Sequence, residues 1–529
     1  MSDASQPPLI RALLQSPALL GHPARSPRLV ETHISWVILT GEFAYKIKKP
    51  VNLGFLDFST LALRRHYCEE ELRLNRRLAP QIYLAVVPIT GSPEAPRLGG
   101  AGTPFEYAVK MRQFDPDQQF DRLLARQALT YDHIDTVARQ ISVFHEDAAV
   151  APRDSDYGTL EAVWQPVAEN HEQILPLLKD ADEIARLERL QDWFHSLRAR
   201  HEALFLERKA RGRIRECHGD LHLANIALYR GEVVIFDCLE FNDRLRWIDV
   251  ISDAAFLVMD LECRGRRDLG FRFLNDYLHH GGDYEGLPLL PYYLAYRAMV
   301  RAKVARIRLA QPDLDQETRR RAQEEFRTYL SLAEGYARPP RPALLITHGL
   351  SGAGKTTVTQ PLLERLGAVR IRSDVERKRL FGLDSSTHKA VAPGRDIYSA
   401  AASERTYRRL AELAATVIEA GYPVIVDATF LKRAERESFR RLAKRLRVPF
   451  VILHCHAPLP LLRQWIRERQ AAGSDASDAD LAVLEHQLAG QEPLAEEEQR
   501  QVVDIDTETH IDAATLARRV GERIDQASA

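Results

Sequence analysis

The sequence has few cysteines, no long apolar segment and no excess of either charge. Its 529 residues include five cysteines, and no two of them form a CxxC pair. Scattered cysteines of this kind predict reduced thiols and a cytoplasmic location rather than a disulfide framework. The short apolar stretches near the N-terminus are interrupted by Arg11, Pro17 and Pro23 and lack a basic region before them. We therefore expect no signal peptide, no membrane-spanning segment and no membrane partner.

The composition is that of an ordinary globular protein. Charged residues make up 28% of the chain, hydrophobic residues 45%, and the formal net charge is −1. This balance gives no overall electrostatic attraction for nucleic acid, so nucleic acid is not the favoured partner. The length exceeds what a single hydrophobic core usually organises, and we expect several domain-sized units. The oligomeric state does not follow from these features.

A glycine-rich loop follows the apolar run 343–346 and has the full Walker A pattern. In such a loop, backbone N–H groups converge on phosphate oxygens, Lys355 neutralises the β/γ oxygens, and the Thr356 hydroxyl can hold Mg²⁺. The sequence therefore predicts an ATP-binding domain in the last third of the chain. The predicted ATP-binding residues of this loop are Gly349, Leu350, Ser351, Gly352, Ala353, Gly354, Lys355, Thr356 and Thr357.

A second signature of phosphoryl transfer lies upstream, in the loop 218–225 and the strand-like run 232–237. Asp220 and Asn225 are five residues apart, as in the catalytic loop of a kinase. At this spacing Asp220 would accept the proton of an attacking hydroxyl, and Asn225 would reach a metal ion. Asp237 ends the apolar run, where it would hold Mg²⁺. The chain thus carries two unrelated kinase-type motifs.

Three prolines between residues 337 and 342 predict a linker between two domains. Before it, we expect a hairpin over 35–48, a helix over 60–78, strands over 85–89 and 105–111, and helices from about 118 onward. This order predicts an N-terminal helical extension (1–34) and an α+β, protein-kinase-like bilobal domain (35–336) with lobes of about 35–112 and 113–336. Residues 343–529 predict an α/β P-loop domain with a doubly wound parallel sheet.

The loop 218–225 reads HGDxHxxN, and with 236–237 it resembles the aminoglycoside phosphotransferase and choline kinase family. This resemblance covers about 35–335. It implies that a strand lysine, Lys46 in preference to Lys48, contacts the ATP phosphates. Its helix partner would be Glu70, chosen from the three consecutive glutamates 69–71. The sequence shows no activation loop, which favours a small-molecule hydroxyl acceptor over a protein.

The second domain resembles the P-loop kinases of the gluconate kinase, zeta-toxin and polynucleotide 5′-hydroxyl kinase group. The resemblance rests on a strand that ends in Ser-Asp, with an arginine three residues after the acid. It implies that Asp374 is the catalytic acid beside the acceptor hydroxyl and that Arg377 binds the acceptor. Asp427 ends a later apolar run as the Walker B candidate for Mg²⁺. In a lid helix, Arg467 is expected to contact ATP.

Other polar residues have simpler interpretations. Asp249 and Asp253 are expected to brace the catalytic loop, because buried acids must be hydrogen-bonded. His454 and His456 lie on one face of a strand and could chelate a metal ion. No third ligand is near them in the sequence, so a pair without function is the expected interpretation.

These features predict an ATP- and Mg²⁺-dependent phosphotransferase with two sites, each acting on a small-molecule hydroxyl. One alternative is a regulatory protein in which one domain binds ATP without turnover. Another is a nucleic-acid 5′-hydroxyl kinase, for which a basic run near Asp374 would form the binding groove. The residues of that run are Arg370, Arg372, Arg377, Lys378 and Arg379.

Overall fold

The computed structural model describes residues 6–20, 27–54, 56–311, 314–338, 341–383, 397, 399–472, 480–509 and 512–528. They form two compact units. Unit 1 comprises Met1–His133, Phe144–Gln165 and Ala203–Leu257, and unit 2 comprises Ile134–Val143, Pro166–Glu202 and Val258–Ala529. Among the described residues, none of the helices is both long and apolar enough to cross a bilayer.

Unit 1 contains a six-stranded antiparallel sheet in the order β1-β2-β3-β6-β4-β5. The predicted hairpin is confirmed, because β2 and β3 pair with Val37 opposite Lys46. A purely helical N-terminal extension is expected from the sequence, but residues 28–31 form a strand that pairs with β2. The bounds are α1 Pro8–Gln15, β1 Arg28–Glu31, β2 Ser35–Leu39, β3 Phe43–Lys48, α2 Leu61–Asn75, β4 Tyr83–Ser92, β5 Ala95–Leu98 and β6 Glu106–Arg112.

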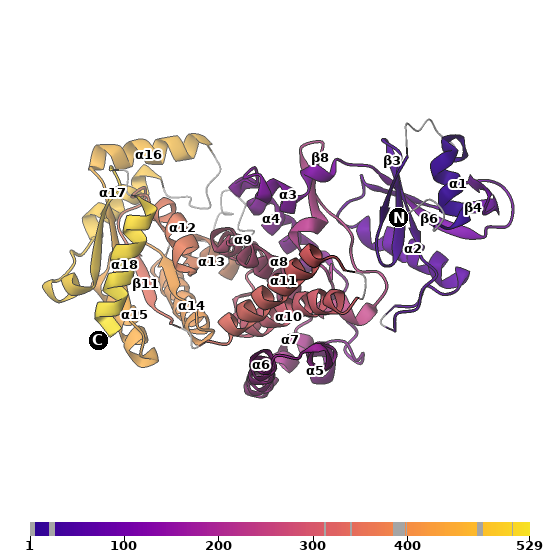
Figure 1. The fold of residues 1–529 in the computed structure, drawn as a ribbon. Coiled ribbons are helices and arrows are strands. Elements are labelled where there is room, and N and C mark those ends of the chain that lie inside the picture. Colours follow the sequence, from indigo (N-terminus) through magenta and orange to yellow (C-terminus); the bar gives the residue numbers. More distant parts are fainter. Residues whose placement is uncertain are drawn as a thin grey trace. The chain divides into compact units, whose positions relative to one another are not determined.

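The two faces of this sheet are covered by different helices. Tyr45 and Ile47 of β3 pack with α1 in one apolar cluster. Because successive side chains of a strand point to opposite faces, Lys46 and Lys48 face the other side, where α2 packs on β4 and β6. Helix α2 begins after Thr60, whose hydroxyl accepts a hydrogen bond from the Leu63 N–H at 3.2 Å. Figure 1 labels α1, α2 and these strands.

Helices and two small two-stranded sheets make up the middle of the chain. β7 pairs with β10, and β8 pairs with β9, both antiparallel. The predicted strand over 232–237 is confirmed over 232–235 as β9, and residues 236–237 follow its end. The bounds are α3 Phe120–Ala125, α4 Tyr131–Asp147, α5 Leu160–Ile174, α6 Ala181–Arg200, α7 Glu202–Ala210, β7 Ile214–Glu216, β8 Ile226–Tyr229, β9 Glu232–Ile235, β10 Trp247–Asp249, α8 Val250–Cys263, α9 Arg267–Gly281, α10 Leu290–Leu309 and α11 Gln316–Tyr336.

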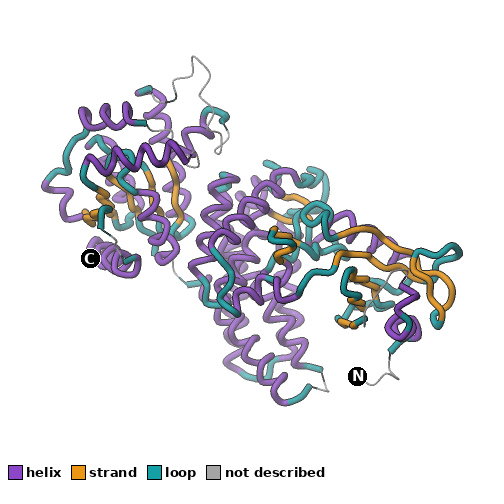
Figure 2. Tube along the Cα trace, turned by 90° about the horizontal axis from the view of Figure 1, so that it is seen from above, coloured by secondary structure: helices purple, strands orange, loops and turns teal. Residues whose placement is uncertain are grey.

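Unit 2 contains a five-stranded, all-parallel sheet in the order β12-β13-β11-β14-β15. Helices cover both faces of the sheet, which confirms the doubly wound fold, and Figure 2 shows the strands as a layer between helices. The bounds are β11 Leu344–His348, α12 Lys355–Leu366, β12 Val369–Arg372, α13 Ser373–Leu380, α14 Ala400–Glu419, β13 Val424–Asp427, α15 Arg433–Leu446, β14 Phe450–His456, α16 Leu459–Ala472, α17 Leu481–Gly490, η8 Glu496–Gln501, β15 Val502–Asp506 and α18 Ala513–Ser528.

Within unit 2, helix α9 closes the edge of the parallel sheet. The side-chain amide of Asn275 accepts a hydrogen bond from the Arg370 N–H at 2.7 Å and donates one to the Ala368 carbonyl at 2.9 Å. Asn275 thus takes the place of a neighbouring strand beside β12 and satisfies backbone groups that an edge strand leaves unpaired. The predicted linker 337–342 lies between α11 and β11, and its residues 339 and 340 fall outside the described residues.

Candidate active sites

The first candidate site is the loop between β7 and β8, which carries the predicted Asp220 and Asn225. The Asn225 amide donates to the Asp220 carbonyl at 3.0 Å and to its Oδ2 at 3.2 Å. Its Oδ1 therefore remains as the atom that could coordinate a metal ion. The Asp220 side chain is 39% exposed, and His222 Nε2 lies 3.4 Å from its Oδ2. The structure thus brings the two predicted residues together with one carboxylate open to solvent.

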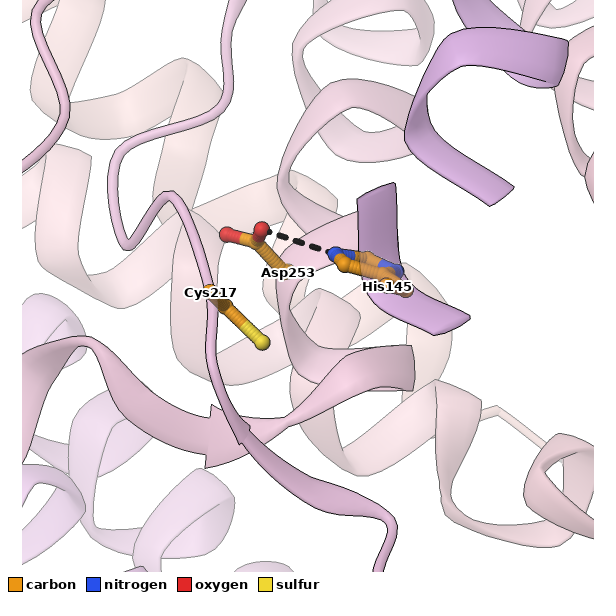
Figure 3. Close-up of side chains that lie close together, drawn as sticks. All are labelled: His145, Cys217 and Asp253. Atoms are coloured by element: carbon orange, nitrogen blue, oxygen red, sulfur yellow. Dashed lines mark hydrogen bonds and ion pairs between the residues drawn. The ribbon is translucent and has the colours of Figure 1, made fainter. Parts of the chain in front are cut away.

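Asp253 anchors the loop that carries Asp220 and Asn225. Its carboxylate accepts hydrogen bonds from the backbone N–H groups of His218 and Gly219, both at 2.9 Å, and contacts His145 Nε2 at 3.0 Å. Figure 3 shows His145, joined to this carboxylate by a dashed line, and Cys217 close by. The three side chains are close enough to suggest a metal cluster. However, both Asp253 oxygens already accept hydrogen bonds, and the expectation that Asp253 braces the loop is confirmed.

Asp249 is a second brace. The Arg208 guanidinium donates to both of its carboxylate oxygens at 2.6 Å, and both side chains are buried. The Ile251 N–H donates to the same carboxylate at 3.0 Å. Paired and hydrogen-bonded in this way, Asp249 fixes the end of β10 and the start of α8, as expected of a structural acid.

Lys46 points at Asp237. Its ammonium lies 2.7 Å from Asp237 Oδ1 and 2.9 Å from Glu71 Oε1. The prediction that Glu70 pairs with this lysine is wrong. One residue along a helix is a turn of about 100°, so Glu70 faces away from β3 and pairs with Arg73 at 2.8 Å instead.

Glu71 lies between two lysines. Its second oxygen is 2.8 Å from Lys48 Nζ, and Lys48, which is 1% exposed, also contacts Glu240. Burial alone would lower the pKa of Lys46, but the carboxylates of Asp237 and Glu71 outweigh it and raise that pKa. Lys46 therefore keeps its positive charge, which a group that binds phosphate needs. Lys48 is fully buried against Glu71 and Glu240, so its role is structural.

Asp237 adopts the left-handed backbone region, with φ of 62°. This conformation is uncommon for a residue other than glycine and often marks a functional site. The Asp237 N–H donates to the Tyr83 hydroxyl at 3.3 Å, and the preceding carbonyl, of Phe236, bonds His218 Nε2 at 2.9 Å. These contacts hold the turn, while the Asp237 side chain remains 43% exposed beside Lys46.

The second candidate site is the phosphate loop between β11 and α12. At Gly349, φ is +146°, and a Cβ would lie 2.2 Å from the Cys455 carbonyl oxygen, so only glycine fits. The Lys355 ammonium folds back over the loop and donates to the carbonyls of Gly349 at 3.0 Å and Leu350 at 2.8 Å. Gln487 of α17 accepts from the Ser351 N–H at 2.8 Å, a contact that no sequence motif signals.

Thr356 and Asp427 meet at the start of α12. The Thr356 hydroxyl donates to Asp427 Oδ2 at 2.7 Å, and Asp427 is 5% exposed at the end of β13. A hydroxyl and a carboxylate side by side are the donor set that Mg²⁺ prefers. Burial lowers the pKa of Lys355, and the Asp427 charge opposes that shift. The predicted Walker A and Walker B residues therefore converge.

Asp374 and Arg377 lie on α13, directly after β12. Asp374 is close enough for its charge to act on the Lys355 pKa. Arg467 of the lid helix is exposed, and its contact with ATP stays a prediction. Arg469 is half-buried, and its positive charge is the one that reaches Lys355. The two arginines are two positions apart on α16, so only one of them can face the loop.

The basic run around Asp374 is largely engaged within the protein. The Arg370 guanidinium donates to the Thr356 carbonyl at 3.0 Å and to Gln360 Oε1 at 2.7 Å. Lys378 is 3% exposed, and Arg379 donates to a backbone carbonyl of α9 at 2.9 Å. Arg370 and Arg379 are thus engaged by groups of the protein itself, and Lys378 is buried. This weakens the case for a nucleic-acid groove, which needs exposed cations.

Two family models match the chain. One described as "Phosphotransferase enzyme family" matches residues 60–299, and one described as "AAA domain" matches residues 344–494. Together with the fold and the two candidate sites, these matches define an ATP-dependent phosphotransferase with two kinase-type domains. Residues 60–299 include Asp220 and Asp237, and residues 344–494 include the whole phosphate loop.

Similar proteins include "Uncharacterized protein Rv2004c" of Mycobacterium tuberculosis and "Uncharacterized protein Mb2027c" of Mycobacterium bovis. Each is 33% identical over 463 residues, which cover 86% of this chain and 88% of the relative. The chain belongs to the family that these mycobacterial proteins represent.

Among solved structures, an ethanolamine kinase of Plasmodium vivax is 9% identical, with 62% of this chain and 87% of that chain covered and a TM-score of 0.39. A gluconokinase from Sinorhizobium meliloti is 19% identical, with 36% and 95% covered and a TM-score of 0.25.

Proposed function

We propose that the protein has two separate ATP sites, each of which transfers the γ-phosphate of ATP to a hydroxyl group of a small-molecule acceptor in the presence of Mg²⁺. One observation carries this proposal. In each half of the chain, a lysine and metal-binding side chains converge: Lys46 lies 2.7 Å from Asp237, and Thr356 lies 2.7 Å from Asp427 next to Lys355.

At the first site, Asp220 is positioned to act as the base. As the acceptor oxygen bonds to the γ-phosphorus, the bond from that phosphorus to the β,γ-bridging oxygen breaks and ADP leaves. The hydroxyl proton passes to the Asp220 carboxylate, which is 39% exposed and held by Asn225. Lys46 would hold the α- and β-phosphates, and the buried Glu71 keeps its ammonium in place.

At the second site, the bonds that form and break are the same. Asp374 would take the acceptor proton, and Arg377 on the same helix would bind the acceptor. The Lys355 ammonium, now on the carbonyls of Gly349 and Leu350, would move to the β- and γ-phosphates. Of the two arginines near the end of the lid helix, Arg469 would reach the phosphates, because its charge already acts on Lys355.

The residues present fit Mg²⁺ at both sites. Asp237 and Asn225 would hold it in the first, and Thr356 and Asp427 in the second, where a hydrogen bond already joins the Thr356 hydroxyl to the Asp427 carboxylate. The ion would offset the negative charge that develops on the β- and γ-oxygens.

The test is ADP release from ATP by the full chain, supplied with a library of hydroxyl-bearing metabolites. We expect Asp220→Asn to abolish turnover with one set of acceptors and Lys355→Ala to abolish it with another. Asp154→Asn and Lys444→Ala make the same charge changes at exposed positions and should leave both activities unchanged. Loss of all turnover in either single variant would contradict two independent sites.

Two further outcomes would redirect the proposal. If ATP raises the melting temperature but no acceptor yields ADP, the protein binds ATP as a regulatory ligand. If phosphate is transferred to an oligonucleotide with a 5′-hydroxyl, and Lys355→Ala abolishes this transfer, the acceptor of the second site is a nucleic acid.

A further inference from the structure

Three side chains with metal-ligating atoms meet at the carboxyl edge of β14 and β15. They are His454, His456 and Asp504, and one ligand atom of each lies within 4.8 Å of the others. His456 Nε2 is 3.1 Å from Asp504 Oδ2. The sequence suggested no third ligand for the two histidines. The structure corrects this, because the parallel register places Asp504 of β15 directly beside His454 of β14.

A fourth residue, His348, supports the cluster from the neighbouring strand. Its Nδ1 lies 2.8 Å from His454 Nδ1, and β11 places it opposite His454 in register. Two ring nitrogens at this distance share one proton. When His348 Nδ1 accepts that hydrogen bond, His454 carries its proton on Nδ1 and keeps the lone pair of Nε2 for a metal ion. A second residue that fixes the tautomer of a ligand in this way is typical of metal sites.

Burial increases from the ligands toward this supporting residue. The side chains of His456 and Asp504 are 42% and 63% exposed, His454 is half-buried, and His348 is 6% exposed. The outer ligands are therefore accessible from solvent, and the inner histidines are held by the protein. An entry path combined with a fixed inner shell is what a metal site requires.

We propose that His454, His456 and Asp504 bind a divalent zinc ion, with His348 as the residue that orients His454. Two imidazoles and one carboxylate are a donor set suited to Zn²⁺, with a fourth position open to water. Ligands about 2.0–2.1 Å from a tetrahedral ion are roughly 3.3 Å apart. The His456–Asp504 separation of 3.1 Å is close to this value.

This site is distinct from the two proposed Mg²⁺ sites. The proposed Mg²⁺ ligands bind through oxygen atoms only. The cluster on β14 and β15 has two nitrogen donors, which favour zinc over magnesium. A bound ion would link β15, the edge strand of the sheet, to β14. The supporting residue His348 directly precedes Gly349, the first residue of the phosphate loop, so the zinc site would be connected to that loop.

The experiment uses the full chain, stripped of metal with a chelator and titrated with zinc chloride against a chromophoric zinc indicator. We expect the wild type to bind one zinc ion per chain. In His456→Ala and in Asp504→Asn this binding should be lost, or its affinity should fall at least tenfold. His348→Phe should lower the affinity by about 10- to 100-fold, as expected for the loss of an orienting partner. His486→Ala removes an exposed histidine of α17 and serves as the matched control.

Thermal unfolding gives a second readout, since an ion that binds the folded state raises the melting temperature. Zinc should stabilise the wild type and the His486→Ala variant but not His456→Ala. ATP should still stabilise His456→Ala, which shows that this variant is folded. The proposal fails if the wild type takes up no zinc, or if His456→Ala and Asp504→Asn take up as much as the wild type.

Discussion

Replacing Glu71 with glutamine removes the one charge that two lysines share. Glu71 is fully buried, and its oxygens lie 2.9 Å from Lys46 Nζ and 2.8 Å from Lys48 Nζ. The substitution keeps the shape of the side chain but leaves each lysine with a single carboxylate, Asp237 or Glu240. We expect a large loss of stability and a weaker hold on the ATP phosphates, because Lys46 loses the group that positions it.

The size of the effect follows from burial. Removing one partner of a buried ion pair costs roughly 3–5 kcal/mol. Since Lys46 and Lys48 each keep one carboxylate, we expect the lower end, about 3 kcal/mol. In a unit of this size, each kcal/mol shifts the melting temperature by about 2–4 °C, so Glu71→Gln should lower it by about 6–12 °C.

The assay is thermal and urea unfolding at pH 7 with Glu70→Gln as the matched control. Glu70 is the preceding residue of α2 and loses the same charge, but its partner Arg73 has a side chain that is 47% exposed. The buried Arg246, 3.5 Å from Glu70, keeps Glu216 and Asp243 as partners. Exposed pairs contribute about 0–1 kcal/mol. Equal destabilisation by the two substitutions would refute the assignment of Glu71, rather than Glu70, as the partner of Lys46.

Three further predictions follow from the same contacts. Burial raises the pKa of Glu71, but the charges of Lys46 and Lys48 outweigh it and lower that pKa below the ordinary value of 4.5. Its contribution is therefore complete above about pH 4.5 and is lost as the pH falls below it. Because that pKa is lowered to about 2, the stability gap between wild type and Glu71→Gln should shrink as the pH falls from about 4.5 to about 2 in urea titrations, and a constant gap would contradict this. Asp253→Asn should cost about 1–3 kcal/mol in the same assay. His218 and Gly219 donate to different oxygens of Asp253, and the amide nitrogen that replaces one of them cannot accept a hydrogen bond. An unchanged midpoint would show that these bonds do not hold the loop. Gly349→Ala should abolish the nucleotide binding that is lost in Lys355→Ala, which is the binding at the phosphate loop. Gly382→Ala should leave it unchanged, because Gly382 also has a positive φ but has open space around it. Normal binding by Gly349→Ala would contradict the close approach of Gly349 to the Cys455 carbonyl.

Both folds could be predicted from local patterns. The phosphate loop after an apolar run fixes β11 and α12, and the alternation around Lys46 fixes the hairpin β2–β3. The strand at 28–31 was missed because its sequence, Arg-Leu-Val-Glu, is short and mostly exposed, with its pairing set by β2 rather than by its own residues.

The identity of side-chain partners was harder to predict than the motifs. Three consecutive glutamates give no periodic signal for the one that faces β3, and the choice depends on how α2 packs on the sheet. The lid arginine presents the same difficulty, since Arg467 and Arg469 lie two positions apart on α16 and only the structure shows that Arg469 is the less exposed of the two. Asp504 lies 48 residues from His456, and only the parallel pairing of β14 and β15 brings them together.

The most direct test of the account is the number of ATP sites per chain, measured by equilibrium titration with a non-hydrolysable ATP analogue and Mg²⁺. We predict two molecules bound per chain. Lys355→Ala and Asp237→Asn should each leave one, and the double variant should leave none. A wild-type chain that binds a single molecule would contradict the central claim that Lys46 with Asp237, and Lys355 with Asp427, define two separate nucleotide sites.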